Sequence, residues 1–175
     1  MTVQSVHDLA ERPNQRVNHG YAFVMLFWGA LTVVSGVVYT IWDPAISWVY
    51  WAIAGPVGGA LTAGYFARRS IRLGIRGKHI WAYPVIGLGI TVSAFAVATL
   101  APPLWIMPAI AIAVGVGNLL FGVLSHYSAV TVAGLGMVAL GLAGGLGGLE
   151  SAPLLFILGG YYALTGLALR ADSSR

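Results

Sequence analysis

The sequence predicts an all-α polytopic membrane protein whose six transmembrane helices form three pseudo-repeated hairpins. Of the 175 residues, 58% are hydrophobic and 8% are charged, and the mean hydropathy is +0.84. Soluble domains carry roughly a quarter charged residues. The apolar residues also fall into runs of about 20, which is the length that a helix needs to cross the hydrocarbon layer of a bilayer. A third observation, the one-sided distribution of basic residues, predicts the topology.

Six apolar windows follow one another and account for most of the chain. They cover residues 20–41, 47–67, 80–100, 104–124, 130–149 and 153–169. The sequence therefore predicts one transmembrane domain over 20–169, with a segment at 1–19 before it and a tail at 170–175 after it. In the first segment, Ser5 and Asp8 approximate a capping box, which predicts a short helix over 5–11. Pro13 is expected to end that helix.

All nine lysines and arginines lie between or outside these windows or at their ends. Five of them form a basic loop between the second and third windows: Arg68, Arg69, Arg72, Arg76 and Lys78. The alternate turns contain Asp43 and Glu150 and no basic residue. Because translocation disfavours lysine and arginine, both termini and the basic loop are predicted to be cytoplasmic in a cell's inner membrane. The basic loop acts either as a topological anchor alone or also as a site for anionic lipid headgroups.

The net charge of +4 is explained by this topology, so nucleic acid is not an expected partner. A shift of 58 residues places the first pair of spans on the second. It aligns Ser35 with Ser93, Pro44 with Pro102, Gly59 with Gly117 and Leu61 with Leu119. A two-span unit re-enters the membrane with the same orientation each time, so three copies would be parallel repeats around an axis near the membrane normal.

The first outer turn has the spacing G-x-x-x-x-x-x-x-P, from Gly36 to Pro44, and a glycine-bearing return helix follows it. This pattern resembles the HdeD-like family of small bacterial membrane proteins, which are built from repeated transmembrane hairpins. The resemblance covers all six spans and rests on glycines and prolines. It implies a bacterial protein linked in name to acid resistance, and it implies no particular biochemical activity.

The 24 glycines require a physical reason, because glycine weakens a helix. In lipid, small residues allow helix backbones to approach one another, so pairs spaced G-x-x-x-G are candidate contact ridges. Such pairs occur at Gly55 and Gly59, Gly141 and Gly145, and Gly144 and Gly148. They pack helices within the chain or join copies of it in a homo-oligomer. The fifth window has no aromatic residue and is expected to be the most enclosed helix.

Few polar side chains fall inside the windows. Asn118 is the most polar of them, and its amide either makes an interhelical hydrogen bond or contacts a bound molecule. Tyr161 and Tyr162 offer further hydroxyls midway along the last window, and Pro56 interrupts the second window and could open its backbone. If a ligand site exists, these four residues are predicted to line it, and the ligand would be apolar or amphipathic.

Three function classes remain. The chain has no cysteine, its four histidines lack metal-ligand spacing, and no ionisable residue lies within a window, so neither catalytic residues, a metal nor a cofactor is predicted. The first interpretation is a non-catalytic structural or accessory membrane protein, with a stress-related role if the HdeD-like resemblance holds. The second is a binding or transport subunit for an apolar or amphipathic small molecule. A membrane-embedded enzyme is the third.

Overall fold

The computed structural model describes residues 3–42, 44–73, 89–90, 92–93, 96, 100, 102–124 and 128–172. These residues form five α-helices and one short 3₁₀-helix: α1 (Val3–Ile41), α2 (Pro44–Leu73), η1 (Pro103–Trp105), α4 (Ile106–Leu124), α5 (Ser128–Leu146) and α6 (Ser151–Asp172). No strand occurs among them. The prediction of an all-α chain is therefore confirmed for this part of the molecule.

Within the described part of the chain, four helices are long and apolar enough to cross a membrane. They are the part of α1 from Gly20 to Ile41, and α4, α5 and α6. Helix α2 is long enough but is not among them, because its tryptophans, tyrosines, glycines and Pro56 lower its hydropathy. Most of the predicted third span, 80–100, lies outside the described residues. The structure thus supports a membrane protein with four candidate spans, two fewer than the sequence predicts.

Two helix boundaries differ from the sequence prediction. The helix expected to end at Pro13 does not end there, because α1 continues from Val3 to Ile41. Proline removes one helical hydrogen bond, which a long helix can lose without ending. Helix α5 ends before residue 149 at a Schellman motif. Gly148 has a φ of 65°, and the N–H of Leu149 donates to the carbonyl of Gly144. Only glycine adopts that φ without cost, so the turn to α6 begins there.

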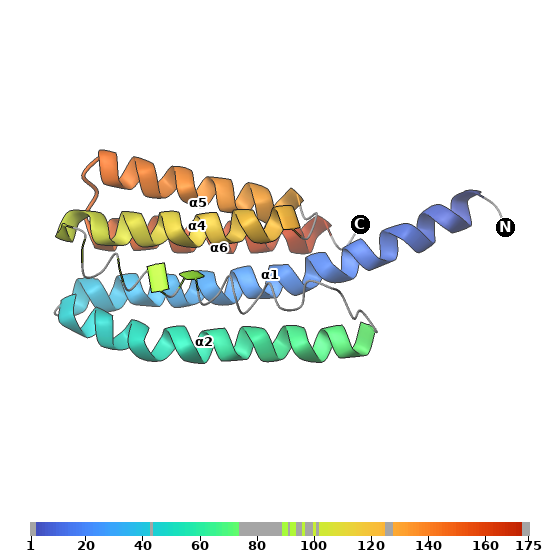
Figure 1. Cartoon of the computed structure of the whole chain (residues 1–175), viewed down its shortest axis with the longest axis horizontal. Coiled ribbons are helices and arrows are strands. Elements are labelled where there is room, and N and C mark those ends of the chain that lie inside the picture. The colour runs from blue at the N-terminus through green and yellow to red at the C-terminus, as the bar shows by residue number, and fades with distance from the viewer. Residues whose placement is uncertain are drawn as a thin grey trace.

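The helices run along one common direction (Figure 1). Helix α2 flanks α1 on the side away from α5, and α6 lies among α1, α4 and α5. The α5–α6 turn, with the exposed Glu150, is at the end of the bundle where α1 ends. The C-terminal ends of α2 and α6, which carry the exposed Arg68 and Arg170, are at the opposite end. The exposed Glu150 is therefore at the opposite end of the bundle from the exposed Arg68 and Arg170.

The most extensive helix contact is an antiparallel seam between α1 and α6. A Cβ added at Gly29 would lie 3.0 Å from the carbonyl oxygen of Gly159, and one added at Gly159 would lie 3.0 Å from that of Gly29. Seven residues along α6, a Cβ at Gly166 would lie 3.0 Å from the carbonyl oxygen of Ala22. A spacing of seven keeps residues on one side of a helix, so these small residues form one contact line.

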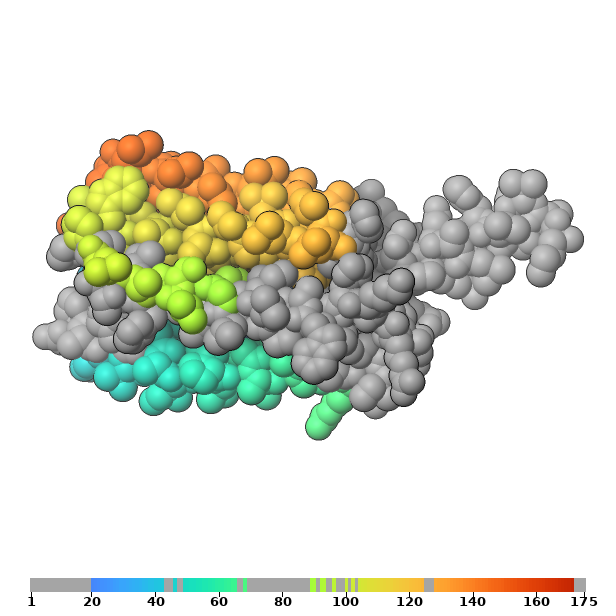
Figure 2. Space-filling model, viewed as in Figure 1, coloured from blue at the N-terminus to red at the C-terminus, as the bar shows by residue number. Residues whose placement is uncertain are grey.

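A second antiparallel seam joins α4 to α5 in the same way. A Cβ added at Gly115 would lie 2.9 Å from the carbonyl oxygen of Gly134, and one at Gly134 would lie 2.7 Å from that of Gly115. Seven residues along α5, a Cβ at Gly141 would lie 2.8 Å from the carbonyl oxygen of Pro108. The surfaces of α4 and α5 adjoin along the molecule in Figure 2. Both seams gain dispersion contact through close backbone approach.

These seams change the expected helix pairing. Packing is most extensive between α1 and α6 and between α4 and α5, whereas α1 with α2 and α5 with α6 pack less. Among the described helices, the predicted hairpins α1–α2 and α5–α6 are therefore not the tightest units, whereas α4–α5, which joins two predicted hairpins, is one of them. The 58-residue repeat is a relation between sequence segments, and it stays a prediction.

The predicted glycine ridges differ in whether another helix packs against them. A Cβ at Gly55 or Gly59 of α2 would meet no atom within 4 Å, whereas Gly144 faces Leu154 of α6 and Gly145 faces Trp105 of η1. The ridge of α5 is thus a helix contact at Gly144 and Gly145, whereas a Cβ at Gly148 would meet no atom within 4 Å, and the α2 pair is not a contact among the described residues. The expectation that α5 is the most enclosed helix is wrong, because each of the four candidate spans buries 39% of its most apolar window.

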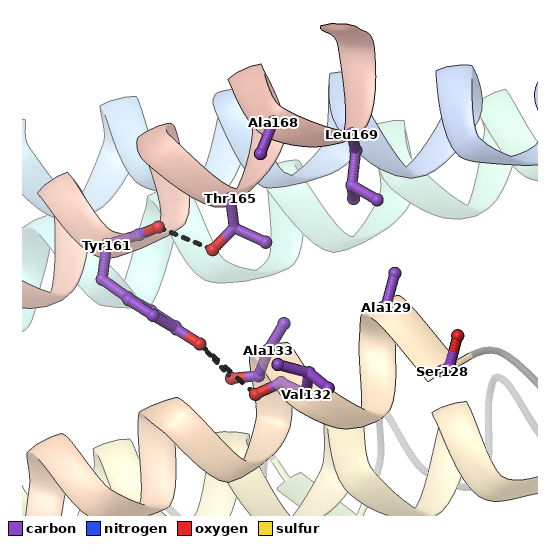
Figure 3. A pocket seen from close by; sticks show the side chains of 8 residues that line it. All are labelled: Ser128, Ala129, Val132, Ala133, Tyr161, Thr165, Ala168 and Leu169. Carbon is purple, nitrogen blue, oxygen red and sulfur yellow. Dashed lines mark hydrogen bonds between the residues drawn. The ribbon is translucent and has the colours of Figure 1, made fainter. Parts of the chain in front are cut away.

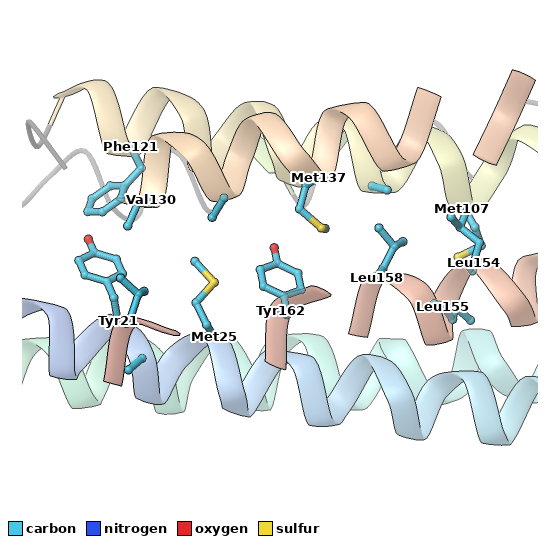
Figure 4. Close-up of a cluster of buried hydrophobic side chains, with 14 residues drawn as sticks. Tyr21, Met25, Met107, Phe121, Val130, Met137, Leu154, Leu155, Leu158 and Tyr162 are labelled. Atoms are coloured by element: carbon cyan, nitrogen blue, oxygen red, sulfur yellow. The ribbon is translucent and has the colours of Figure 1, made fainter. Parts of the chain in front are cut away.

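The hydrophobic core lies where the α1–α6 pair meets the α4–α5 pair (Figure 4). Met25, Met107 and Met137 lie in it, and the rings of Tyr21 and Phe121 meet there at an interplanar angle of 43° with centroids 5.5 Å apart. Methionine is flexible and fills irregular gaps. The contact between the pairs is therefore built from adaptable side chains, unlike the glycine seams within each pair.

Candidate functional site

Asn118 and Tyr162 form a hydrogen bond inside the bundle. The amide Nδ2 of Asn118 on α4 donates to the hydroxyl oxygen of Tyr162 on α6 over 2.9 Å. Tyr162 is buried, and Figure 4 shows its hydroxyl pointing toward the α4–α5 side of the core. The bond links the two helix pairs across the core. It is the interhelical alternative of the two interpretations that the sequence left open for Asn118.

Tyr161 points toward α5. Its hydroxyl donates to the carbonyl oxygens of Ala133 and Val132, over 3.2 and 3.4 Å (Figure 3). A Cβ added at Gly136 would collide with that hydroxyl, so the absence of a side chain at Gly136 makes room for it. The adjacent tyrosines of α6 thus bond to different helices, Tyr162 to α4 and Tyr161 to α5. The sequence alone suggests that the two hydroxyls act together, but adjacent residues of a helix point about 100° apart, so the two side chains face different helices.

Tyr161 also lines a groove between α5 and α6. The groove has a volume of about 490 Å³, and its lining residues are Ser128, Ala129, Val132, Ala133, Tyr161, Thr165, Ala168 and Leu169. Ala133 and Leu169 are buried and form its floor, whereas Ser128, Val132 and Ala168 are exposed at its rim. The Thr165 hydroxyl donates to the carbonyl of Tyr161 over 2.8 Å. The sequence predicted Tyr161 here, but nothing in it indicated the small residues of α5.

Ser35 is a buried hydroxyl that sequence reasoning did not select as a site. It is 0% exposed, and its Oγ has no hydrogen-bond partner in the structure. Helical serines commonly bond to the carbonyl four residues earlier, as Thr32 does to Trp28 over 2.8 Å. The equivalent acceptor for Ser35 is Leu31, whose carbonyl instead accepts a 2.8 Å bond from the Tyr50 hydroxyl of α2. This arrangement depends on how α2 packs on α1, which no local sequence pattern specifies.

Three further predicted residues, Pro56, Glu150 and Arg68, are not brought to this region. Pro56 is exposed on α2, which packs mainly on α1 and runs through that proline without ending. Glu150 and Arg68 are exposed at opposite ends of the bundle. Other predicted positions lie outside the residues or side chains that are described: Asp43, Arg69, Arg72, Arg76 and Lys78.

The chemistry available in the described core is hydrogen bonding and apolar contact. Its polar side chains are the amide of Asn118 and hydroxyls such as those of Thr32, Ser35 and Tyr162. Within the described part of the chain, no three His, Cys, Asp or Glu side chains gather where they could hold a metal ion. These groups suit helix association or contact with a neutral, amphipathic molecule.

Comparisons with protein-family models, curated proteins and solved structures found no match to this chain. The HdeD-like resemblance therefore stays a prediction that rests on Gly36, Pro44 and the glycines of the return helix.

Proposed function

We propose that this protein is a non-catalytic integral membrane protein with a structural or accessory role. The observation that carries the proposal is the Asn118–Tyr162 hydrogen bond, because it uses the most polar side chain of the predicted spans to join two helix pairs. Tyr161 likewise bonds to α5, and Trp28 of α1 donates to Thr62 of α2 over 3.1 Å. Polar side chains that form hydrogen bonds between helices favour a structural role, because an unpaired polar group in hydrocarbon is costly in free energy.

The proposal includes six spans in a bacterial inner membrane, with both termini in the cytoplasm. The positions of α2 and η1 support six spans. Helix α2 terminates on one side of the bundle and η1 begins on the opposite side, and the predicted span 80–100 lies between them in sequence. Support for the orientation comes from Arg68 and Arg170, which share one end of the bundle. The HdeD-like resemblance supports a stress-related role, and anionic lipid at the basic loop remains part of the proposal.

Replacing Asn118 tests the structural role. Asn118→Leu and Tyr162→Phe each remove one partner of the bond, and the double variant completes a mutant cycle. A structural bond predicts that both single variants lower the unfolding temperature in detergent and that their effects are not additive, with a coupling of about 0.6 kcal/mol or more. No small molecule should leave the protein. If the variants unfold at the parent's temperature and release a bound molecule instead, the structural proposal fails.

A second candidate is a binding subunit for an apolar or amphipathic molecule. The groove between α5 and α6 favours it, because its volume of about 490 Å³ is within the range of small-molecule sites. A small molecule that co-purifies with the parent protein would favour this candidate over the structural one, because a scaffold needs no bound molecule. A molecule held in the groove should remain bound to the Asn118→Leu variant, since Asn118 does not line the groove.

A further inference from the structure

We propose that the α5–α6 groove holds one acyl chain of an anionic phospholipid, from the leaflet at the end of the bundle that carries Arg170. The inference rests on the second candidate function and names its ligand class. It concerns residues other than the basic loop, to which the sequence assigned lipid headgroups.

The residues that line the groove favour a hydrocarbon ligand over a polar one. The Tyr161 hydroxyl is bonded to the Val132 and Ala133 carbonyls, and the Thr165 hydroxyl is bonded to the Tyr161 carbonyl. With these hydroxyls engaged, the groove presents mainly the methyl groups of alanine, valine and leucine. A polar ligand would lose its hydration there without gaining partners. The bonds of Tyr161 also connect the two walls, so the groove is preorganised and little entropy is lost when a chain enters.

The polar end of the groove lies where a headgroup would be. Ser128, the first residue of α5, lies in Figure 3 at the same end of the groove as Ala168 and Leu169, opposite Tyr161. Arg170 follows Leu169 directly and is exposed, and Arg68 of α2 is at the same end of the bundle. Asp172 ends α6 two residues after Arg170, so these two residues and Arg68 together leave one net positive charge at that level, which complements an anionic headgroup. The ligand is therefore amphipathic, with its charged end near α6's last turn and its tail toward Tyr161.

The length of the groove fits one leaflet. From Tyr161 to Leu169 the helix advances eight residues, or about 12 Å, which is slightly less than half of the roughly 30 Å hydrocarbon layer. By comparison, the seam between α1 and α6 extends from Gly36 to Ala22 of α1, or about 21 Å. The short groove fits the tail of a lipid better than a second helix.

Substitutions at the rim provide a test on the full-length protein. Ala168→Leu places three further carbons over the groove, and Ala129→Leu does so from the α5 wall. Ala139→Leu is the matched control, because Ala139 is exposed on α5 and does not line the groove. Each variant is purified in detergent, mixed with phosphatidylglycerol or with phosphatidylcholine of the same acyl chains, and analysed by native mass spectrometry.

The parent and Ala139→Leu should each retain one phosphatidylglycerol and prefer it to phosphatidylcholine. Ala168→Leu and Ala129→Leu should retain about tenfold less, since excluding about two methylene groups from the groove has that effect. Arg170→Gln should reduce the preference for the anionic lipid and leave phosphatidylcholine retention unchanged. Equal retention by the groove variants and the control overturns the proposal, as does equal binding of the two lipids by the parent. The unfolding temperature of Asn118 variants reports separately on the structural function.

Discussion

Gly29 of α1 and Gly159 of α6 approach each other reciprocally, so that a Cβ on either residue would lie 3.0 Å from the carbonyl oxygen of the other. Gly115 of α4 and Gly134 of α5 repeat this relationship at 2.9 and 2.7 Å. In both seams a further glycine, seven residues along the second helix, meets a carbonyl of the first. The bundle therefore contains two helix pairs that are held by the same device, and helices far apart in sequence, α1 and α6, form one of them.

Gly29→Leu should destabilise the protein strongly. Its Cβ would lie 2.9 Å from the backbone nitrogen of Ala163, so the helices must separate. Overpacking of this kind costs about 1–3 kcal/mol or more. Gly59→Leu is the matched control, because a Cβ there meets nothing within 4 Å. Thermal unfolding in detergent should show a lower midpoint for the first variant only. Equal midpoints for both variants would contradict the seam.

Ser35→Ala should leave the stability unchanged or raise it. The Ser35 hydroxyl is buried without a partner, and its removal relieves a desolvation cost of about 1–3 kcal/mol. Thr32→Val serves as the comparison, because it removes a hydroxyl that bonds to the Trp28 carbonyl and should give no such gain. The measurement is again thermal unfolding in detergent. A clear loss of stability in Ser35→Ala would show that its hydroxyl has a bonding role.

Single cysteines should reveal the sidedness of the two ends of the bundle. The chain contains no cysteine, so Glu150→Cys and Arg68→Cys each introduce one reactive thiol at an exposed position. In intact cells, a membrane-impermeant maleimide should label the cysteine at position 150, while the one at position 68 should react only after permeabilisation. Labelling of both in intact cells, or the reverse pattern, would reject the proposed orientation.

Much of the helical structure could be predicted from the sequence. An apolar run of about 20 residues has no structure available in lipid other than a helix or a barrel strand, because its backbone must satisfy its own hydrogen bonds. The windows 20–41, 104–124, 130–149 and 153–169 correspond within a few residues to the part of α1 from Gly20 to Ile41 and to helices α4, α5 and α6. Boundaries were less predictable, because Pro13 does not end α1 and the left-handed φ of Gly148 ends α5 early.

The candidate site was partly predictable. Asn118 stood out as a polar side chain in an apolar window, and such a group requires a partner. The sequence did not identify that partner, since Tyr161 and Tyr162 are adjacent and only the rotation of α6 assigns Tyr162 to α4. Pro56 was selected for its effect on the backbone of its own helix, which does not determine what that helix packs against. The alanines of the α5–α6 groove carry no local signal at all.

By itself, the sequence determined that this protein is a set of long apolar helical segments with its basic residues outside those segments, because these properties depend on each segment's own energy of transfer into lipid. Only the tertiary structure decided which helices meet. Gly55 and Gly59 have the same spacing as Gly141 and Gly145, yet a Cβ on the first pair would contact nothing and one on the second would contact α4 and η1. A small residue permits close approach from any helix, so the choice of partner depends on the packing of the whole bundle.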